Sequence, residues 1–97
     1  MAATEISVVV PAYNEEALIQ STLDGLRSYL FARPESFEIV VVDDGSQDRT
    51  VALIEEWKRS NQVLLKLLVN PTNRGKGYSV RRGVQESCGR FIIFMDA

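Results

Sequence analysis

Cysteine, excess basic charge and long apolar runs are all scarce in this chain of 97 residues, and each scarcity excludes a class of protein. Cys88 is the only cysteine, so the sequence cannot form an internal disulfide or a zinc site built from cysteines, and it fits a reducing compartment best. The net charge of −2 gives a nucleic-acid backbone no basic field to bind.

Long apolar segments are missing as well. The apolar runs fall far short of the ~20 residues that a helix needs to cross a bilayer. Glu5 interrupts the basic start that a signal peptide would have. We therefore expect a cytoplasmic chain with no membrane span of its own.

The rest of the composition is that of an ordinary globular protein, with 45% hydrophobic and 25% charged residues. This length allows one domain with one modest core. Short apolar runs alternate with segments whose apolar residues recur at helical spacing, which is typical of repeated βα units. We predict strands over residues 6–10, 38–43, 63–69 and 91–95, and helices that begin near Asn14, Ser46 and Gly75.

Repeated βα units predict an α/β protein with an open parallel sheet and helices on both faces, because crossovers between parallel strands are right-handed in nearly all cases. We predict the strand order 3-2-1-4. In the first helix, Asn14 would be the N-cap and Leu18 would face inward. The third helix would bury Val80 and Val84 and end at Gly89.

Three of the predicted strands end in polar residues. Tyr13 follows the first strand, Asp44 follows the second, and Asp96 closes the fourth. Ligands of open parallel sheets bind at the carboxyl ends of the strands, where the strand order reverses, so we expect these residues to open onto one crevice. Neighbouring strand residues point to opposite faces, so one acid of the Asp43-Asp44 pair should reach the site and the other should hold the turn through backbone amides.

Four motifs make this pattern more specific. They are Val8-Val9-Val10-Pro11-Ala12-Tyr13-Asn14-Glu15-Glu16, Val41-Val42-Asp43-Asp44-Gly45-Ser46, Asn73-Arg74-Gly75-Lys76-Gly77 and Phe94-Met95-Asp96-Ala97. Together they resemble the family 2 glycosyltransferases, over nearly the whole chain, and look most like the branch of dolichyl-phosphate glucosyltransferases and mannosyltransferases. The resemblance implies a GT-A fold whose Rossmann-like first half binds a nucleotide-diphosphate sugar.

The resemblance also implies roles for single residues. Pro11 and Tyr13 would line the base pocket, with the Tyr13 ring flat against the base, and Val42 would approach the base through its backbone. Glu15 would contact the nucleotide; the alternative is that it only favours the start of a helix. Asp44 would accept a hydrogen bond from the ring N–H of uracil or guanine, a donor that adenine lacks.

Lys76, Asp96 and Ala97 would face the diphosphate. Lys76, Arg81 or Arg82 would steady phosphate charge together with helix-start amides, unless these side chains are only a solvated basic helix face. Asp96 and Ala97 resemble the first two positions of an Asp-x-Asp motif, in which Asp96 would hold Mg²⁺ or Mn²⁺ against the diphosphate. The closing Asp is expected after residue 97, so residues 1–97 would be the truncated N-terminal part of the domain, and Asp96 alone would bind metal poorly.

The implied activity is transfer of a hexose from UDP-glucose or GDP-mannose to a polyprenyl phosphate, with inversion at the anomeric carbon. A phosphate acceptor is already anionic and needs no strong general base. Any base and the acceptor groove would lie after residue 97, so we expect the chain alone to bind nucleotide without transferring sugar.

The full-length protein would act at the cytoplasmic face of a membrane. The apolar strand over residues 91–95 would be an uncovered edge through which the chain self-associates.

Two other interpretations stay open. A phospho-receiver signalling module is also a doubly wound sheet, and Asp43, Asp44 and Asp96 roughly imitate its acidic cluster. In a receiver, however, the acidic pair follows the first strand, and Tyr13 would have no role. A catalytically inactive nucleotide-binding relative would keep the same pocket without turnover.

Overall fold

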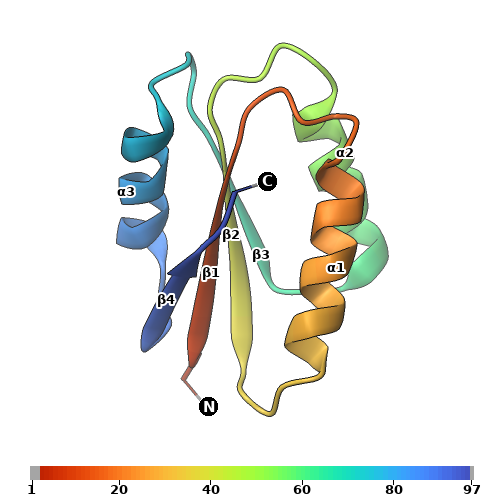
Figure 1. The fold of residues 1–97 in the computed structure, drawn as a ribbon, viewed down its shortest axis with the longest axis vertical. Coiled ribbons are helices and arrows are strands. Elements are labelled where there is room, and N and C mark those ends of the chain that lie inside the picture. The colour runs from red at the N-terminus through yellow and green to blue at the C-terminus, as the bar shows by residue number, and fades with distance from the viewer. Residues whose placement is uncertain (1–2, 97) are drawn as a thin grey trace.

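The computed structural model of the chain describes residues 3–96, which alternate between strands and helices (Figure 1). The elements are β1 (Ile6–Ala12), α1 (Ile19–Phe31), β2 (Phe37–Asp43), α2 (Thr50–Asn61), β3 (Leu65–Val69), α3 (Lys76–Glu86) and β4 (Phe91–Phe94).

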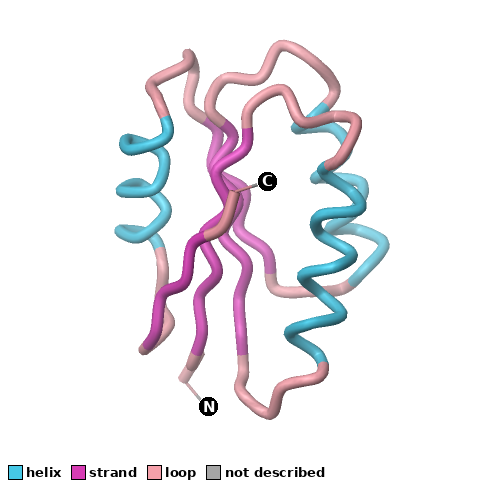
Figure 2. The backbone as a smooth tube through the Cα atoms, in the orientation of Figure 1, coloured by secondary structure: helices cyan, strands magenta, loops and turns pink. Residues whose placement is uncertain are grey.

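The four strands form one parallel sheet in the order β3-β2-β1-β4, which confirms the predicted order. Helices α1 and α2 cover one face of the sheet and α3 covers the other (Figure 2). In the central strand β1, Val9 is in register with Val40 of β2 and with Phe94 of β4. The chain is therefore a Rossmann-like α/β sheet whose order reverses at β1 and β4.

The central strands are buried on both faces, which explains their continuous runs of β-branched residues. Val9, Val10 and residues 39–42 expose 0% of their surface. The larger core lies between the sheet and the α1–α2 layer, where Leu23 and Trp57 pack. The Trp57 indole N–H donates to Asp24 Oδ1 (2.8 Å), so the two helices are also joined by a hydrogen bond.

Helix α3 packs on the sheet through small residues, so the prediction that it buries Val80 and Val84 is wrong. Its buried residues are Ser79 and Gly83, whereas Val84 is 38% exposed. A Cβ atom added at Gly83 would lie 2.4 Å from Val9 Cγ1. The helix approaches the sheet so closely that only small residues fit directly against it, and Val80 is only half-buried.

Helix α1 begins at Ile19, so Asn14 is not its N-cap, and Leu18 is exposed rather than inward. Asn14 adopts a φ of 50° and is engaged elsewhere. Its N–H donates to Ser46 Oγ (2.8 Å), and its Oδ1 accepts from the Gln47 N–H (2.9 Å). These bonds join the loop after β1 to the loop after β2, and they use the polar groups that a helix cap would need.

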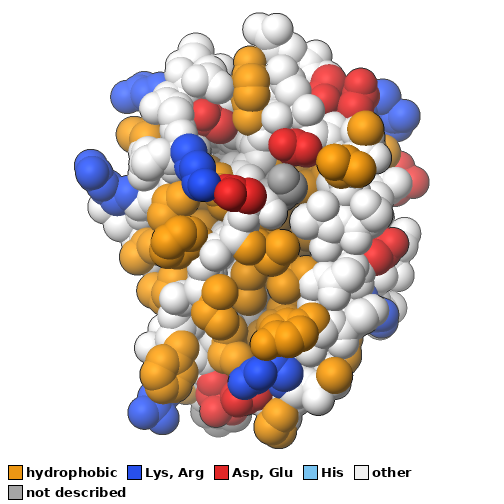
Figure 3. All heavy atoms as spheres, viewed as in Figure 1, with side chains coloured by type: hydrophobic (Ala, Val, Ile, Leu, Met, Phe, Trp, Pro, Cys, Tyr) orange, Lys and Arg blue, Asp and Glu red, His pale blue; other side chains and the backbone are white. Residues whose placement is uncertain are grey.

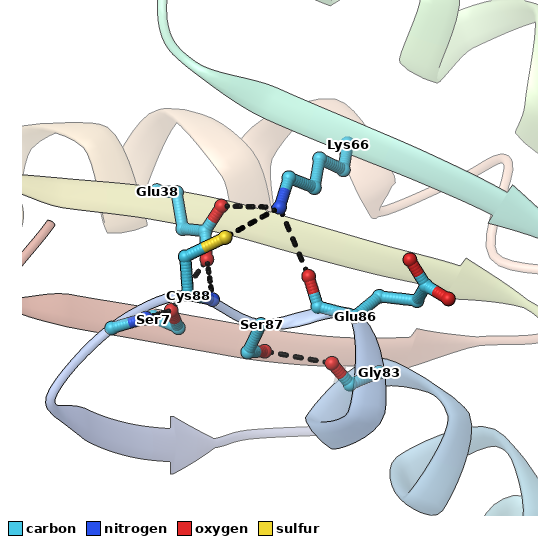
Figure 4. Close-up of polar contacts among 8 residues, drawn as sticks. Ser7, Glu38, Lys66, Gly83, Glu86, Ser87 and Cys88 are labelled. Carbon is cyan, nitrogen blue, oxygen red and sulfur yellow. Dashed lines mark hydrogen bonds and ion pairs between the residues drawn. The ribbon is translucent and has the colours of Figure 1, made fainter.

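A buried carboxylate holds the exit of α3 against the amino ends of the strands (Figure 4). Glu38 is 0% exposed; it accepts from the Ser7 hydroxyl (2.6 Å) and the Cys88 N–H (2.7 Å) and pairs with Lys66 Nζ (3.1 Å). Burial alone would raise the pKa of the Glu38 carboxyl, but these donors outweigh it and hold the pKa below its ordinary value.

Gly89 belongs to the same contact and does not cap α3 as predicted, because α3 ends at Glu86. The Gly89 N–H donates to Ser7 Oγ (2.8 Å). A Cβ atom at this position would lie 2.6 Å from the Ser7 backbone nitrogen. The glycine is required by close backbone approach, not by a helix end.

Strand β4 is an edge strand with an apolar surface. Its residues are between 39% and 64% exposed, and Figure 3 shows apolar side chains gathered on the face that carries this strand. Self-association through this edge stays a prediction. Among residues 3–96, no helix has the length and apolar character needed to span a membrane.

Candidate functional site

A pocket of about 340 Å³ opens at the carboxyl ends of the strands. Tyr13 follows β1, Asp44 follows β2 and Asp96 follows β4, and all three line this pocket. The complete lining is Pro11, Ala12, Tyr13, Glu15, Asp44, Asn73, Gly75, Lys76, Ser79 and Asp96. The structure thus brings the three strand ends together at the point where the strand order reverses.

Asp44 is the most constrained group of the pocket. It is 5% exposed; its Oδ1 accepts from the Arg74 N–H (2.7 Å) and from Asn70 Nδ2 (2.8 Å), and its Oδ2 accepts from the Gly75 N–H (2.9 Å). Burial alone would raise the pKa of the Asp44 carboxyl, but the Arg74, Asn70 and Gly75 donors lower it below its ordinary value. The carboxyl is therefore ionised at neutral pH and can only accept hydrogen bonds.

The neighbouring Asp43 holds the turn, as the alternation along the strand predicts. Its Oδ2 accepts from the Ser46 N–H (2.9 Å) and its Oδ1 from the Ser46 hydroxyl (2.6 Å). Ser46 does not cap α2, which begins at Thr50. The two acids of the pair have separate tasks, because Asp43 closes its own turn and Asp44 faces the pocket.

Two glycines allow the loop before α3 to reach Asp44. Gly75 has a φ of 98° and a ψ of 159°, a combination essentially restricted to glycine, and this conformation directs its N–H at the carboxylate. Gly45 has a φ of 76°, and a Cβ there would lie 2.7 Å from the carbonyl carbon of Thr72. The loops after β2 and β3 therefore lie in direct contact.

Lys76 and Asp96 both line the pocket and form an ion pair. Lys76 Nζ lies 2.5 Å from Asp96 Oδ1, and both side chains are more than half exposed. This ion pair joins the first turn of α3 to the residue after β4.

The donor set fits a divalent cation that arrives with a phosphate group. Within residues 3–96, no group of three or more His, Cys, Asp or Glu side chains is arranged to hold a metal. Mg²⁺ and Mn²⁺ nevertheless take oxygen ligands, and Mg²⁺ is commonly bound through one or two carboxylates with waters and substrate phosphates. The exposed Asp96 carboxylate is a ligand of that kind.

The remaining candidate residues differ in position. Pro11, Tyr13 and Glu15 line the pocket, and the Tyr13 side chain is 43% exposed. Val42 is fully buried and is not part of the lining, and its Cγ2 would be 3.1 Å from a Cβ at Gly83, on the α3 side of the sheet. Ala97 lies outside the described residues. The binding roles of all these residues stay predictions.

The sequence interpretation missed Asn70 and Ser79, and it considered Arg82 only as a possible phosphate contact. Asn70 is 1% exposed, Ser79 is 0% exposed, and Arg82 Nη1 donates to Asn70 Oδ1 (2.8 Å). Asn70 directly follows β3, so its place after a parallel strand carried the same signal as Asp44, but the Asn70-Pro71 pair indicated only a turn. No sequence signal singles out Arg82 from the exposed Arg81 beside it.

The strand order, the flanking helices and a pocket at the switch point define a Rossmann-like α/β domain of the GT-A type. The chain belongs to glycosyl transferase family 2, whose model matches residues 7–97. Family membership replaces the phospho-receiver interpretation.

Several relatives with curated descriptions are dolichyl-phosphate beta-glucosyltransferases. The protein from Dictyostelium discoideum is 42% identical over an alignment of 101 positions, which covers 95% of this chain and 30% of the relative. The human protein is 39% identical over 101 residues, covering 96% of this chain and 31% of the relative. The chain thus spans about 30% of the length of the curated relatives it matches.

Solved structures agree with the fold. The mannosyltransferase PcManGT from Pyrobaculum calidifontis, in complex with GDP-Man and Mn²⁺, superposes with a TM-score of 0.84 at 26% identity, covering 99% of this chain and 28% of that one. TarS 1-349 from S. aureus, in complex with UDP-GlcNAc, gives a TM-score of 0.82 at 33% identity, covering 96% of this chain and 26% of that one.

Proposed function

We propose that this chain is the donor-binding part of a glycosyltransferase that transfers a hexose from UDP-glucose or GDP-mannose to a polyprenyl phosphate, with inversion. The observation that carries the proposal is the single pocket that Tyr13, Asp44 and Asp96 share. The relatives are described as dolichyl-phosphate glucosyltransferases, and solved neighbours hold GDP-Man or UDP-GlcNAc, which supports the donor class and the acceptor class.

The nucleobase would lie at the Asp44 end of the pocket. An ionised carboxylate offers only acceptors, so it favours uracil and guanine, which present a ring N–H, over adenine and cytosine, which do not. The flat ring of Tyr13 would lie against the base, with Pro11 beside it. Glu15 would contact the nucleotide from the loop after β1, and Val42 would contribute only its backbone.

The diphosphate would lie at the Lys76–Asp96 end of the pocket. Lys76 would neutralise part of its charge, and Asp96 with Ala97 would face the sugar phosphate. A divalent cation held there by Asp96 would, when bound, offset the charge that grows on the diphosphate as the sugar–phosphate bond breaks. Because a phosphate acceptor is already anionic, the described residues need not supply a strong base.

The chain alone is expected to bind nucleotide and not to transfer sugar, since it covers about 30% of its relatives. We also propose a cytoplasmic location, which the lone Cys88 supports.

Titration calorimetry of the full chain with UDP, GDP and ADP, with and without Mn²⁺, tests the proposed nucleotide binding. We expect UDP or GDP to bind more tightly than ADP, and more tightly with Mn²⁺ than without it. Equal affinity for all three nucleotides, or no binding, would contradict the proposal.

The inactive relative is separated from an active enzyme by one further measurement. Transfer of labelled hexose to a polyprenyl phosphate by the full-length protein is expected. Nucleotide binding with no transfer by that protein would favour the inactive relative instead.

A further inference from the structure

We propose that Asn70 and Arg82 are positioning residues that aim the Asp44 carboxylate and thereby set which nucleobases the pocket accepts. The inference rests on the proposed function, because it assigns a task to groups that do not line the pocket themselves. Neither residue is among the pocket's lining residues. Asn70 contacts two lining residues, Asp44 and Ser79, and Arg82 contacts Asn70.

Both N–H groups of the Asn70 side-chain amide donate hydrogen bonds. One N–H of Nδ2 donates to Asp44 Oδ1 (2.8 Å), and the other donates to Ser79 Oγ (2.9 Å). An amide has only two such donors, so nothing is left over for water. Asn70 itself is 1% exposed, and Ser79 and Asp44 are 0% and 5% exposed. These hydrogen bonds are therefore shielded from water, so a polar group left without its partner there would destabilise the fold.

Arg82 decides which way the Asn70 amide points. Its Nη1 donates to Asn70 Oδ1 at 2.8 Å, and a guanidinium can only donate. A rotation of the amide by 180° would turn its NH₂ toward Arg82 and its oxygen toward the Asp44 carboxylate, so both contacts would become repulsive. Arg82 thus fixes the amide, and the amide fixes Asp44.

The backbone strengthens the same arrangement. The Asn70 N–H donates to the Asp43 carbonyl (2.8 Å), which holds residue 70 beside the end of β2. The Arg74 and Gly75 N–H groups occupy further acceptor positions of Asp44. Few acceptor positions of the Asp44 carboxylate therefore remain for a ligand. The direction in which these positions point depends on the donors that orient the carboxylate. A base with a ring N–H in that direction binds, and one with a lone pair there is rejected.

Helix α3 supplies two of these contacts, Ser79 and Arg82, and also carries Lys76 in its first turn. The base end and the diphosphate end of the pocket are therefore held by one rigid element. Loss of the Arg82 contact should loosen the base end, while Lys76 keeps its pairing with Asp96.

The test compares base selectivity in wild type, Arg82→Met and Asn70→Ala, by calorimetry of the full chain with UDP, CDP, GDP and ADP. The readout is the affinity ratio of UDP to CDP and of GDP to ADP. A wild-type ratio of about tenfold or more is expected for the preferred pair, since a hydrogen bond to a charged acceptor is involved. The ratio should fall to within about twofold of unity in both variants, and Arg82→Lys should restore part of it.

A general loss of structure would weaken all four nucleotides together and leave the ratio unchanged, so the ratio separates positioning from mere destabilisation. Arg59→Met, on the exposed face of α2, is the matched control and should keep the wild-type ratio. If Arg82→Met shows no cooperative thermal unfolding, Arg82→Ala, which also lacks a donor, is judged by the same criterion. Wild-type selectivity retained in the folded variants would overturn the inference and leave the proposed function intact. A wild type that binds none of the four nucleotides would overturn both.

Discussion

Lys76 Nζ lies 2.5 Å from Asp96 Oδ1, so a cation of the protein already pairs with the carboxylate that the sequence predicts as a metal ligand. The pair joins α3 to the residue after β4, and both of its members line the pocket. A divalent ion that binds Asp96 through Oδ1 would displace Lys76, and a diphosphate could accept the displaced ammonium group. Metal and nucleotide should therefore bind better together than separately.

Replacing Lys76 by methionine should strengthen Mn²⁺ binding in the absence of nucleotide. The competing ammonium group is removed, and because the pair is solvent-exposed the gain should be no more than about two- to fivefold. Affinity for UDP or GDP without metal should fall in the same variant. Electron paramagnetic resonance of free Mn²⁺ measures the first effect, and Lys58→Met on the exposed face of α2 is the control. Unchanged or weaker Mn²⁺ binding in Lys76→Met would show that Lys76 does not compete with the metal for Asp96.

Replacing Tyr13 by alanine should weaken nucleotide binding through loss of the aromatic surface. Stacking of a base on an aromatic side chain is worth about 1–3 kcal/mol, which corresponds to roughly a 5- to 150-fold change in affinity. Tyr13→Phe keeps the flat ring and should stay within about threefold of wild type. Calorimetry with the preferred nucleotide gives both values. Equal affinities of Tyr13→Ala and wild type would mean that the 43% exposed ring is only a loop aromatic.

Replacing Gly83 by alanine should destabilise the fold by about 1–3 kcal/mol, the usual range for overpacking. The new Cβ would lie 2.4 Å from Val9 Cγ1 and 3.1 Å from Val42 Cγ2, and valines in a sheet have little freedom to move. Gly77→Ala is the matched control, because it lies in the same helix with no atom within 4 Å of the new Cβ. The control should stabilise by up to about 1 kcal/mol. Urea unfolding measures both, and equal stabilities would contradict the close contact of α3.

Glu38 should contribute stability at neutral pH that is lost in acid. Its folded-state pKa lies below the ordinary value, so the contribution is fully present above the unfolded pKa near ~4.3 and disappears as pH falls through the folded pKa. Glu38→Gln should lower the free energy of unfolding by about 1–3 kcal/mol at pH 7, and by less near pH 3. Urea unfolding across this pH range measures the difference, with the exposed Glu55→Gln as control. A Glu38→Gln deficit that does not shrink in acid would argue against an ionised, hydrogen-bonded Glu38.

The sheet was predictable because its signal is local. Buried parallel strands require continuous β-branched residues, and such runs flank Val9 and Val41. Right-handed crossovers limit the possible topologies without deciding the strand order, and 3-2-1-4 was assumed as an order that brings the polar strand ends to one crevice. Both rules can be applied to a sequence without knowing any side-chain contact.

The helix starts and the buried polar groups depend on partners far away in the chain, so the sequence could not reveal them. Asn14 looks like a cap, but its bonds go to Ser46 and Gln47, in the loop after β2. Glu38 looks like a solvated strand residue until Ser7 and Lys66 enclose it. The close packing of α3 on the sheet likewise depends on Val9, a residue more than 70 positions before Gly83.

The most direct test of the account is a crystal structure of the chain with its preferred nucleoside diphosphate and Mn²⁺. The account predicts density for the base between Tyr13 and Asp44, with a ring N–H within hydrogen-bonding distance of the Asp44 carboxylate, and the diphosphate beside Lys76 and Asp96. Density for the nucleotide at any other surface, or a base turned away from Asp44, would contradict it.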